Sequence, residues 1–232
     1  MEADLPLGDS ALESAKLARL LALCPRLVLR AGDVRGASDF PDAKLLLVEK
    51  GTVVVASGAS AKRRIAFGFC SQGMLLLPPR LDEQLAAVAD SAVLSVTRAV
   101  ELRLLQLPRA AEAIVDLLLE ALREQQESLA QFANVEHVER VRGKLLQLAR
   151  RHGVVVADGI RVELPLTHAL LAQAVGSARE TVTSALRTLE RDGFLVREGR
   201  RYRLMISPEI FPAGGCCFAS GNSWRKGIRP SA

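Results

Sequence analysis

A short polar stretch near the end of the chain carries side chains suited to contacting the edges of DNA bases. If this stretch is helical, Glu180, Ser184 and Arg187 lie on one face and Arg179 lies at its start, because residues three and four apart are neighbours on a helix. Arginine can donate two hydrogen bonds to guanine in the major groove, and glutamate can accept one from cytosine. The stretch therefore predicts a helix that contacts bases, with an N-terminal end that also suits phosphate groups.

The residues before this stretch predict a second helix that positions it. Thr167 can cap a first helix, and Gly176 falls where that helix must end and the chain must reverse. We expect Ser177 to cap the second helix, with Thr181 and Thr183 beside its outward face. The inward residues of the two helices are apolar: Leu170, Leu171, Ala174, Val182, Ala185, Leu186 and Leu189. This pattern is typical of a helix-turn-helix.

A basic hairpin is predicted directly after the second helix. Asp192-Gly193 and Glu198-Gly199 are turn signals, and they bracket candidate strands at 194–197 and 201–205. The hairpin carries four arginines, namely Arg197, Arg200, Arg201 and Arg203. Such a wing would present its arginines to backbone phosphates.

The charge of the chain is concentrated in the same region. Residues 1–135 hold 15 Lys and Arg against 17 Asp and Glu, whereas residues 136–206 hold 13 against 8. A basic C-terminal part favours a polyanionic partner, because neutralising phosphates releases counterions.

The first half of the chain has a different texture. Residues 12–23 have helical spacing, and short apolar runs from residue 27 to residue 96 are separated by Gly, Pro, Asp or Ser, which predicts an all-β sandwich or barrel. From Pro108 a long helix is expected, followed by a helix at 135–151 and a hairpin at 154–166 that turns at Asp158-Gly159.

The long helix carries an apolar seam at heptad spacing. Its positions are Val115, Leu119, Leu122, Gln126, Leu129 and Ala133. A seam of this kind predicts a parallel two-stranded dimer contact, and the alternative is a helix that packs on its own β domain.

The stretch GSARETVTSALRTLERDGFLV resembles the helix-turn-helix of the cyclic-AMP receptor protein/FNR (Crp/Fnr) family of bacterial transcription regulators. The resemblance is specific over residues 167–204 and weaker over the rest of the chain. It implies an α+β fold with a cyclic-nucleotide-binding-like β-roll at 1–107 and a dimerisation helix at 108–134. A hinge near Asn134 would lead to a winged helix-turn-helix at 135–211, and a flexible tail at 212–232 would follow.

By that resemblance Arg179 and Glu180 would contact bases, and Thr167, Thr181 and Arg200 would contact the backbone. The full set expected at double-stranded DNA is Thr167, His168, Ser177, Arg179, Glu180, Thr181, Ser184, Arg187 and Arg200. A homodimer on a pseudo-palindromic site is implied, and RNA polymerase is a further partner of such regulators. The chain departs from the family at Ala178, where the family has serine, and at Ser184, where it often has arginine.

Cyclic AMP is not expected as an effector in the usual mode. Family members that bind cyclic nucleotides carry a Gly-Glu pair and an Arg-Ser/Thr pair, whereas the stretch GMLLLPPRLDEQLAAVADSAV has no Gly-Glu. Gln84-Leu85 stands where Arg-Ser is expected, and Arg80 lies four residues early. A leucine cannot bind a cyclic phosphate, so the effector is unknown and no cofactor is predicted.

Other effectors stay open at this point. Redox sensing at Cys24 or Cys70, another nucleotide, an unidentified small molecule and no ligand at all remain alternatives. Cys216 and Cys217 are adjacent in the tail, and no pair of cysteines has metal-ligand spacing. The residues expected to contact an effector are Arg80, Gln84, Gln125 and Gln126, the last two on the long helix facing the β-roll.

Several classes of function are disfavoured. The chain has none of the G-x-S-x-G, P-loop, H-E-x-x-H or G-x-G-x-x-G motifs, so we expect no enzyme. No apolar run is long enough for a membrane span, and the acidic N-terminus is unlike a secretory signal, which predicts a cytoplasmic protein. The competing hypothesis is a protein-interaction or scaffolding module that keeps a winged helix without contacting DNA.

Overall fold

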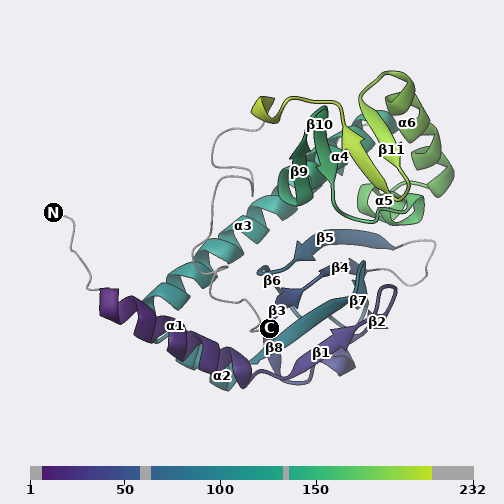
Figure 1. Cartoon of the computed structure of the whole chain (residues 1–232). Helices are drawn as coiled ribbons and strands as arrows, with labels where there is room; N and C mark the ends of the chain where they lie inside the picture. The colour runs from purple at the N-terminus through teal and green to yellow at the C-terminus, as the bar shows by residue number, and fades with distance from the viewer. Residues whose placement is uncertain (1–6, 58–63, 133–135, 211–232) are drawn as a thin grey trace.

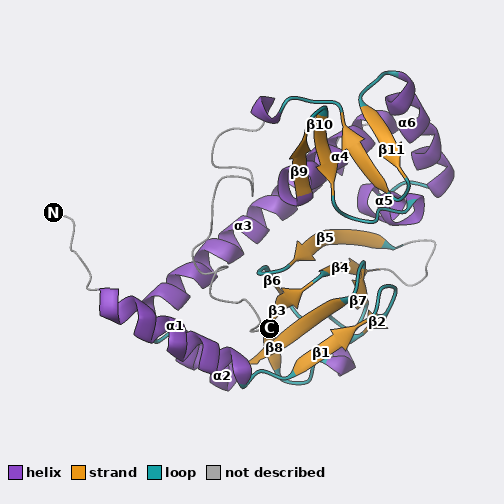
Figure 2. Cartoon of the chain, in the orientation of Figure 1, coloured by secondary structure: helices purple, strands orange, loops and turns teal. Residues whose placement is uncertain are grey.

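A computed structural model describes residues 7–57, 64–132 and 136–210 (Figure 1). The helices are α1 (Leu7–Ala22), α2 (Arg98–Leu104), α3 (Pro108–Phe132), α4 (His137–His152), α5 (His168–Val175) and α6 (Arg179–Arg191), with short 3-10 turns at Ala37–Asp39 and Pro208–Ile210. The strands of the N-terminal half are β1 (Arg26–Leu29), β2 (Val34–Arg35), β3 (Ala43–Lys50), β4 (Thr52–Ser57), β5 (Ile65–Ser71), β6 (Leu75–Leu76), β7 (Glu83–Ala87) and β8 (Ser91–Thr97). Those of the C-terminal half are β9 (Gly153–Val156), β10 (Gly159–Val162), β11 (Leu195–Glu198) and β12 (Arg201–Leu204). The predicted α+β fold, a β-roll followed by a long helix and a winged helix-turn-helix, is confirmed (Figure 2).

The β-roll consists of two antiparallel sheets that enclose an apolar interior. Their strand orders are β1-β8-β3-β6 and β2-β7-β4-β5. Along β3, Leu46 and Val48 belong to the interior cluster, whereas Leu45 and Leu47 belong to a second cluster shared with α1, α2 and α3. This alternation follows from the period of two in a strand, and it gives the first sheet one face inside the roll and one under the helices.

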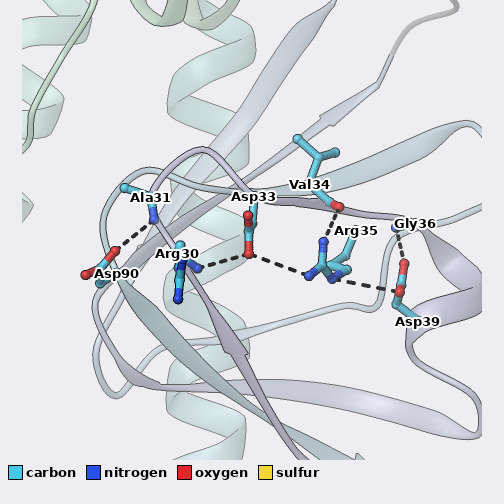
Figure 3. A network of polar contacts seen from close by, with 8 residues as sticks. All are labelled: Arg30, Ala31, Asp33, Val34, Arg35, Gly36, Asp39 and Asp90. Atoms are coloured by element: carbon cyan, nitrogen blue, oxygen red, sulfur yellow. Dashed lines mark hydrogen bonds and ion pairs between the residues drawn. The ribbon is translucent and has the colours of Figure 1, made fainter.

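A network of polar contacts holds the turn between β1 and β2 (Figure 3). The side chain of Asp33 accepts a hydrogen bond from the backbone N–H of Arg30 at 3.1 Å, and Asp90 accepts one from Ala31 at 2.9 Å. Arg35 lies 3.5 Å from the Asp33 carboxylate. These carboxylates satisfy backbone donors and a neighbouring cation, so their role is structural.

A buried polar cluster joins the long helix to the helix that follows it. Lys144 on α4 is 2% exposed and donates to the side-chain oxygen of Gln147 at 2.7 Å and to that of Ser128 on α3 at 3.2 Å. Because a buried ammonium is costly without such partners, the cluster restricts how α3 and α4 can cross.

The winged helix packs against the β-roll of the same chain. Helix α5 lies beside β5, and one core cluster combines Val54, Ala66 and Phe69 of the roll with the buried residues of α4, α5 and α6 (Figure 1). At the edge of this contact, the Ser71 hydroxyl and Nδ1 of His152 are 3.0 Å apart. The two halves of the chain therefore share an apolar interface.

Some details differ from the sequence-based expectations. The first helix begins at Leu7 and not near residue 12, and α2 was not predicted because seven residues are too few for a clear helical period. The predicted hinge at Asn134 and the tail at 212–232, with Cys216 and Cys217, lie outside the described residues. Among the described helices, none is both long and apolar enough to cross a membrane.

Candidate nucleic-acid interface

Helix α5 and its turn have the geometry expected of the first half of a helix-turn-helix. The Thr167 hydroxyl oxygen accepts a hydrogen bond from the backbone N–H of Leu170 at 3.1 Å, so the predicted cap is confirmed. Gly176 ends the helix in the left-handed region with φ of 60°, a conformation that side chains disfavour. The chain then reverses into α6.

Helix α6 divides cleanly into a buried and an exposed face. Val182, Ala185, Leu186 and Leu189 are at most 4% exposed. The side chains predicted to contact bases, Arg179, Glu180, Ser184 and Arg187, are all exposed, and Thr181 is partly exposed. The buried face thus holds α6 in place, and the exposed face presents a row of hydrogen-bonding groups to solvent.

The prediction that Ser177 caps α6 is wrong. The N-cap residue is Ala178, which has extended φ and ψ of −69° and 149° and makes no side-chain cap hydrogen bond. Ser177 lies one residue too early, and its hydroxyl is instead 3.0 Å from Nδ1 of His137 at the start of α4. Arg140 lies beside the same nitrogen at 2.6 Å.

The pairing of Ser177 with His137 joins residues 40 positions apart, so no local sequence pattern could have predicted it. It places the start of α4 beside the turn between α5 and α6. His137 and Arg140 are therefore additional polar residues next to the expected interface, and no motif in the sequence had assigned them to it.

His168 connects the two helices of the motif. Its Nδ1 is 2.9 Å from the hydroxyl of Thr183, which donates to the backbone carbonyl of Arg179 at 2.8 Å. Partial burial lowers the pKa of His168, and the positive charges of Arg197, Arg179 and Arg187 lower it further. One wing arginine and two α6 arginines thus act electrostatically on the same imidazole, which indicates a concentrated positive field there.

The four wing arginines differ in their contacts. Arg203 forms ion pairs with Asp158 and Glu198, each at 2.9 Å, and Arg201 pairs with Glu163 at 3.3 Å. Arg197 donates to the backbone carbonyl of Gly199 at 3.0 Å. Arg200 is exposed, and no carboxylate among residues 7–57, 64–132 and 136–210 pairs with it. Arg201 and Arg203 therefore stabilise the wing, whereas Arg200 projects from it.

The four residues expected to contact an effector are spread over different places. Arg80 is exposed, and its backbone N–H donates to Glu83 at 2.9 Å. Gln84 is partly buried on β7, and its side-chain oxygen is buried without a hydrogen-bond partner among the described residues. Gln125 and Gln126 are both exposed on α3.

The interior of the roll is apolar at the position where cyclic-nucleotide-binding members of the family carry a phosphate-binding pair. Leu85 is 0% exposed and belongs to the interior cluster with Leu46, Val53 and Val93. Cys70 is partly buried and packs against the same cluster, and Cys24, whose pKa is raised by burial, lies in the cluster under α1. In the described part of the chain, no group of three or more His, Cys, Asp or Glu could hold a metal ion.

Comparisons with known proteins agree with this architecture. A family model described as a Crp-like helix-turn-helix domain matches residues 139–207, from α4 to just after β12. A CRP-like cAMP-activated global transcriptional regulator of Mycobacterium tuberculosis is 33% identical over 103 residues, which are 44% of this chain and 46% of that protein. A global nitrogen regulator of Synechococcus elongatus is 28% identical over 173 residues, or 69% of this chain and 77% of that protein. The matched segment spans about half the length of the first of these relatives.

Solved structures extend the similarity to the whole fold. A CooA variant from Carboxydothermus hydrogenoformans has a TM-score of 0.71 at 20% identity, covering 89% of this chain and 94% of that one. The c-di-GMP responsive global regulator CLP of Xanthomonas campestris has a TM-score of 0.66 at 19% identity, covering 84% and 100%. The match of the helix-turn-helix, the relatives and the shared fold together lead to one conclusion: the chain has a Crp-like helix-turn-helix domain at residues 139–207, within a fold like that of these regulators.

Proposed function

We propose that this chain is a sequence-specific DNA-binding transcription regulator that inserts α6 into the major groove. The observation that carries the proposal is the division of α6, whose inner face is buried while Arg179, Glu180, Ser184 and Arg187 are exposed. Arginine at the N-terminal end of such a helix can donate to guanine O6 and N7 together. Thr167, His168, Thr181 and Arg200 surround this face and supply backbone contacts. Ser177 is held by His137, so its part in DNA binding is indirect.

The regulator binds its site as a homodimer formed by α3. The described chain leaves a row of apolar side chains exposed along this helix, including Val115, Leu119, Leu122 and Leu129, which are 52%, 46%, 52% and 69% exposed. Their heptad spacing suits a parallel pair of helices. A two-fold symmetric dimer would bind a pseudo-palindromic site with half-sites about one helical turn apart. Such a regulator acts in the cytoplasm, and RNA polymerase is the partner through which it would affect transcription.

The effector is not cyclic AMP bound in the usual mode. A cyclic phosphate needs a charged donor pair, and the fully buried Leu85 lies in an apolar core at that place. Arg80, Gln84, Gln125 and Gln126 remain the proposed effector contacts. Among the described residues, no hydrogen bond or ion pair joins Arg80 or Gln84 of the roll to Gln125 or Gln126 of α3.

Selection from a random duplex pool tests the proposal. The wild-type protein should enrich a two-fold symmetric site that contains guanine, and Arg179→Ala should lose that enrichment. Arg191→Ala is the matched control, because Arg191 lies in the last turn of α6 and pairs with its neighbour Asp192 at 3.7 Å. If no site is enriched and Arg179→Ala behaves like wild type at low salt, the winged helix is a protein-interaction module.

A further inference from the structure

A cavity outside the β-roll lies between α1, α2, the first turns of α3 and the outer face of the first sheet. Its volume is about 490 Å³. Aliphatic side chains from all of these elements line it, among them Leu17, Leu47, Val96, Leu104 and Leu117. A volume of this size falls within the range of roughly 300–1,000 Å³ that is usual for small-molecule sites.

This cavity is separate from the interior of the roll. Leu45 and Leu47 line it, whereas the alternate residues Leu46 and Val48 point into the roll. A ligand here would occupy a different place from a cyclic nucleotide inside a roll. The cavity therefore needs its own explanation.

The rim of the cavity is acidic. Glu13 of α1 and Arg109 of α3, which both line the cavity, form an ion pair at 3.6 Å. Glu112 and Asp116 line the same opening and are exposed, one turn apart on α3. Three carboxylates against one guanidinium leave the mouth net negative, which complements a cation and repels an anion.

A second copy of the chain does not account for the cavity. At about 100° per residue, the apolar positions Ile114 and Leu117 that line it lie roughly 140° around α3 from the exposed seam of Val115, Leu119 and Leu122. Glu112 lies on the flank of that seam, about 60° from Val115. A partner helix packed on the seam would reach Glu112 but not the apolar lining at Ile114 and Leu117. An occupant that fills it must be small, because four elements of the same chain enclose its sides.

We propose that this cavity binds a small apolar amine, with the hydrocarbon part among the leucines and the ammonium group at Glu112 and Asp116. Burial of the hydrocarbon supplies the affinity, and the acidic rim selects the charge. The cavity lies wholly within residues 13–117, so the binding does not depend on whether α6 contacts DNA.

Calorimetric titration of the full chain with octylamine, octanoate and octan-1-ol tests the proposal. Octylamine should bind saturably with one molecule per chain, and shortening it to hexylamine should weaken binding about tenfold, because two buried methylenes are lost. Octanoate should bind at least about tenfold more weakly than octylamine, given the sign of the rim charge. Replacing both Glu112→Gln and Asp116→Asn should remove this preference.

A filling variant locates the site. Ala113→Phe projects a ring into the cavity and should abolish octylamine binding, whereas Ala111→Phe, at a partly buried position of the same helix outside the lining, should not. Leu17→Phe repeats the test from the opposite wall should Ala113→Phe fail to fold.

Three binding results would overturn the proposal. They are the absence of saturable octylamine binding, equal binding to the Ala113→Phe and Ala111→Phe variants, and octanoate binding as tightly as octylamine. Loss of the dimer in Ala113→Phe, measured by sedimentation equilibrium, would instead assign the cavity to a contact between copies and would also reject the amine.

Discussion

The winged helix and the β-roll place polar and apolar side chains in opposite ways. In the winged helix, an apolar core that includes Val182 and Leu186 supports an exposed row that begins with Arg179 and Glu180. In the roll, the place where nucleotide-binding relatives would carry a charged pair holds the fully buried Leu85. One region thus keeps the surface chemistry that the family resemblance implies, and the other has an apolar interior. The family resemblance therefore extends to the exposed face of α6 but not to the interior of the roll.

Within the wing, the largest effect on DNA binding is expected from the difference between Arg200 and Arg203. Arg200→Ala should weaken DNA binding about tenfold per dimer, because an exposed phosphate contact is lost in each half-site. The slope of log affinity against log salt should fall by about 1 for each lost contact. Fluorescence anisotropy at several salt concentrations measures both quantities.

Arg203→Ala is the matched control for Arg200→Ala. Arg203 is occupied by Asp158 and Glu198, so its loss should destabilise the wing and leave the salt slope unchanged. An unchanged slope in Arg200→Ala together with a reduced slope in Arg203→Ala would show that the two groups have been assigned the wrong way round.

Substitutions at the N-caps of α5 and α6 should change the free energy of unfolding in opposite directions. Thr167→Ala should lower the free energy of unfolding by about 1 kcal/mol, because the Leu170 N–H loses its acceptor. Ala178→Ser should raise it by a similar amount, since Ala178 is an exposed N-cap without a side-chain hydrogen bond. Urea unfolding measures both, and a destabilised Ala178→Ser would contradict the assignment of the N-cap.

A smaller effect is expected from His168. Its pKa is lowered in the folded chain by burial and by the nearby arginines, so the folded state binds a proton less readily than the unfolded state. Stability is therefore fully present above the unfolded pKa of about 6.5 and is lost as the pH falls below it. Because His168 is only partly buried, this loss should be the smallest of the changes in stability expected here. His168→Gln should flatten the pH dependence of urea unfolding between pH 7.5 and 5.5, and an unchanged profile would rule out this residue as its source.

No effect is expected from cyclic AMP on the roll. A ligand present at one hundred times its dissociation constant stabilises the folded state by about 2.7 kcal/mol. At about 1 mM, cyclic AMP would stabilise the folded state by this amount if its dissociation constant were about 10 μM. We expect no such binding, so the melting temperature should stay constant. A clear rise would show that cyclic AMP binds this chain and would contradict the contrast between the two regions.

The sequence predicted those parts of the fold that depend on local periodicity. The two helices of the motif, the Thr167 cap and the turn at Gly176 follow from spacing and from the φ that a residue without Cβ favours. The Crp/Fnr resemblance then supplied the order of the roll, the long helix and the winged helix.

Contacts between distant segments could not be predicted in this way. The pairing of Ser177 with His137, and the cluster of Lys144, Gln147 and Ser128, join side chains that only the tertiary fold brings together. The ion pairs that occupy Arg201 and Arg203 have the same origin, so four wing arginines that look alike in sequence differ in availability.

The most direct test of DNA recognition changes one protein side chain and one base pair, and measures the affinity of each protein for each duplex. Wild type and Arg179→Ala would each be titrated by fluorescence anisotropy with the selected site and with a site in which the key guanine is replaced. Wild type should prefer the guanine by about 1–3 kcal/mol per half-site, and Arg179→Ala should bind both duplexes equally. If Arg179→Ala retains the full preference for guanine, α6 does not recognise its site in the way proposed.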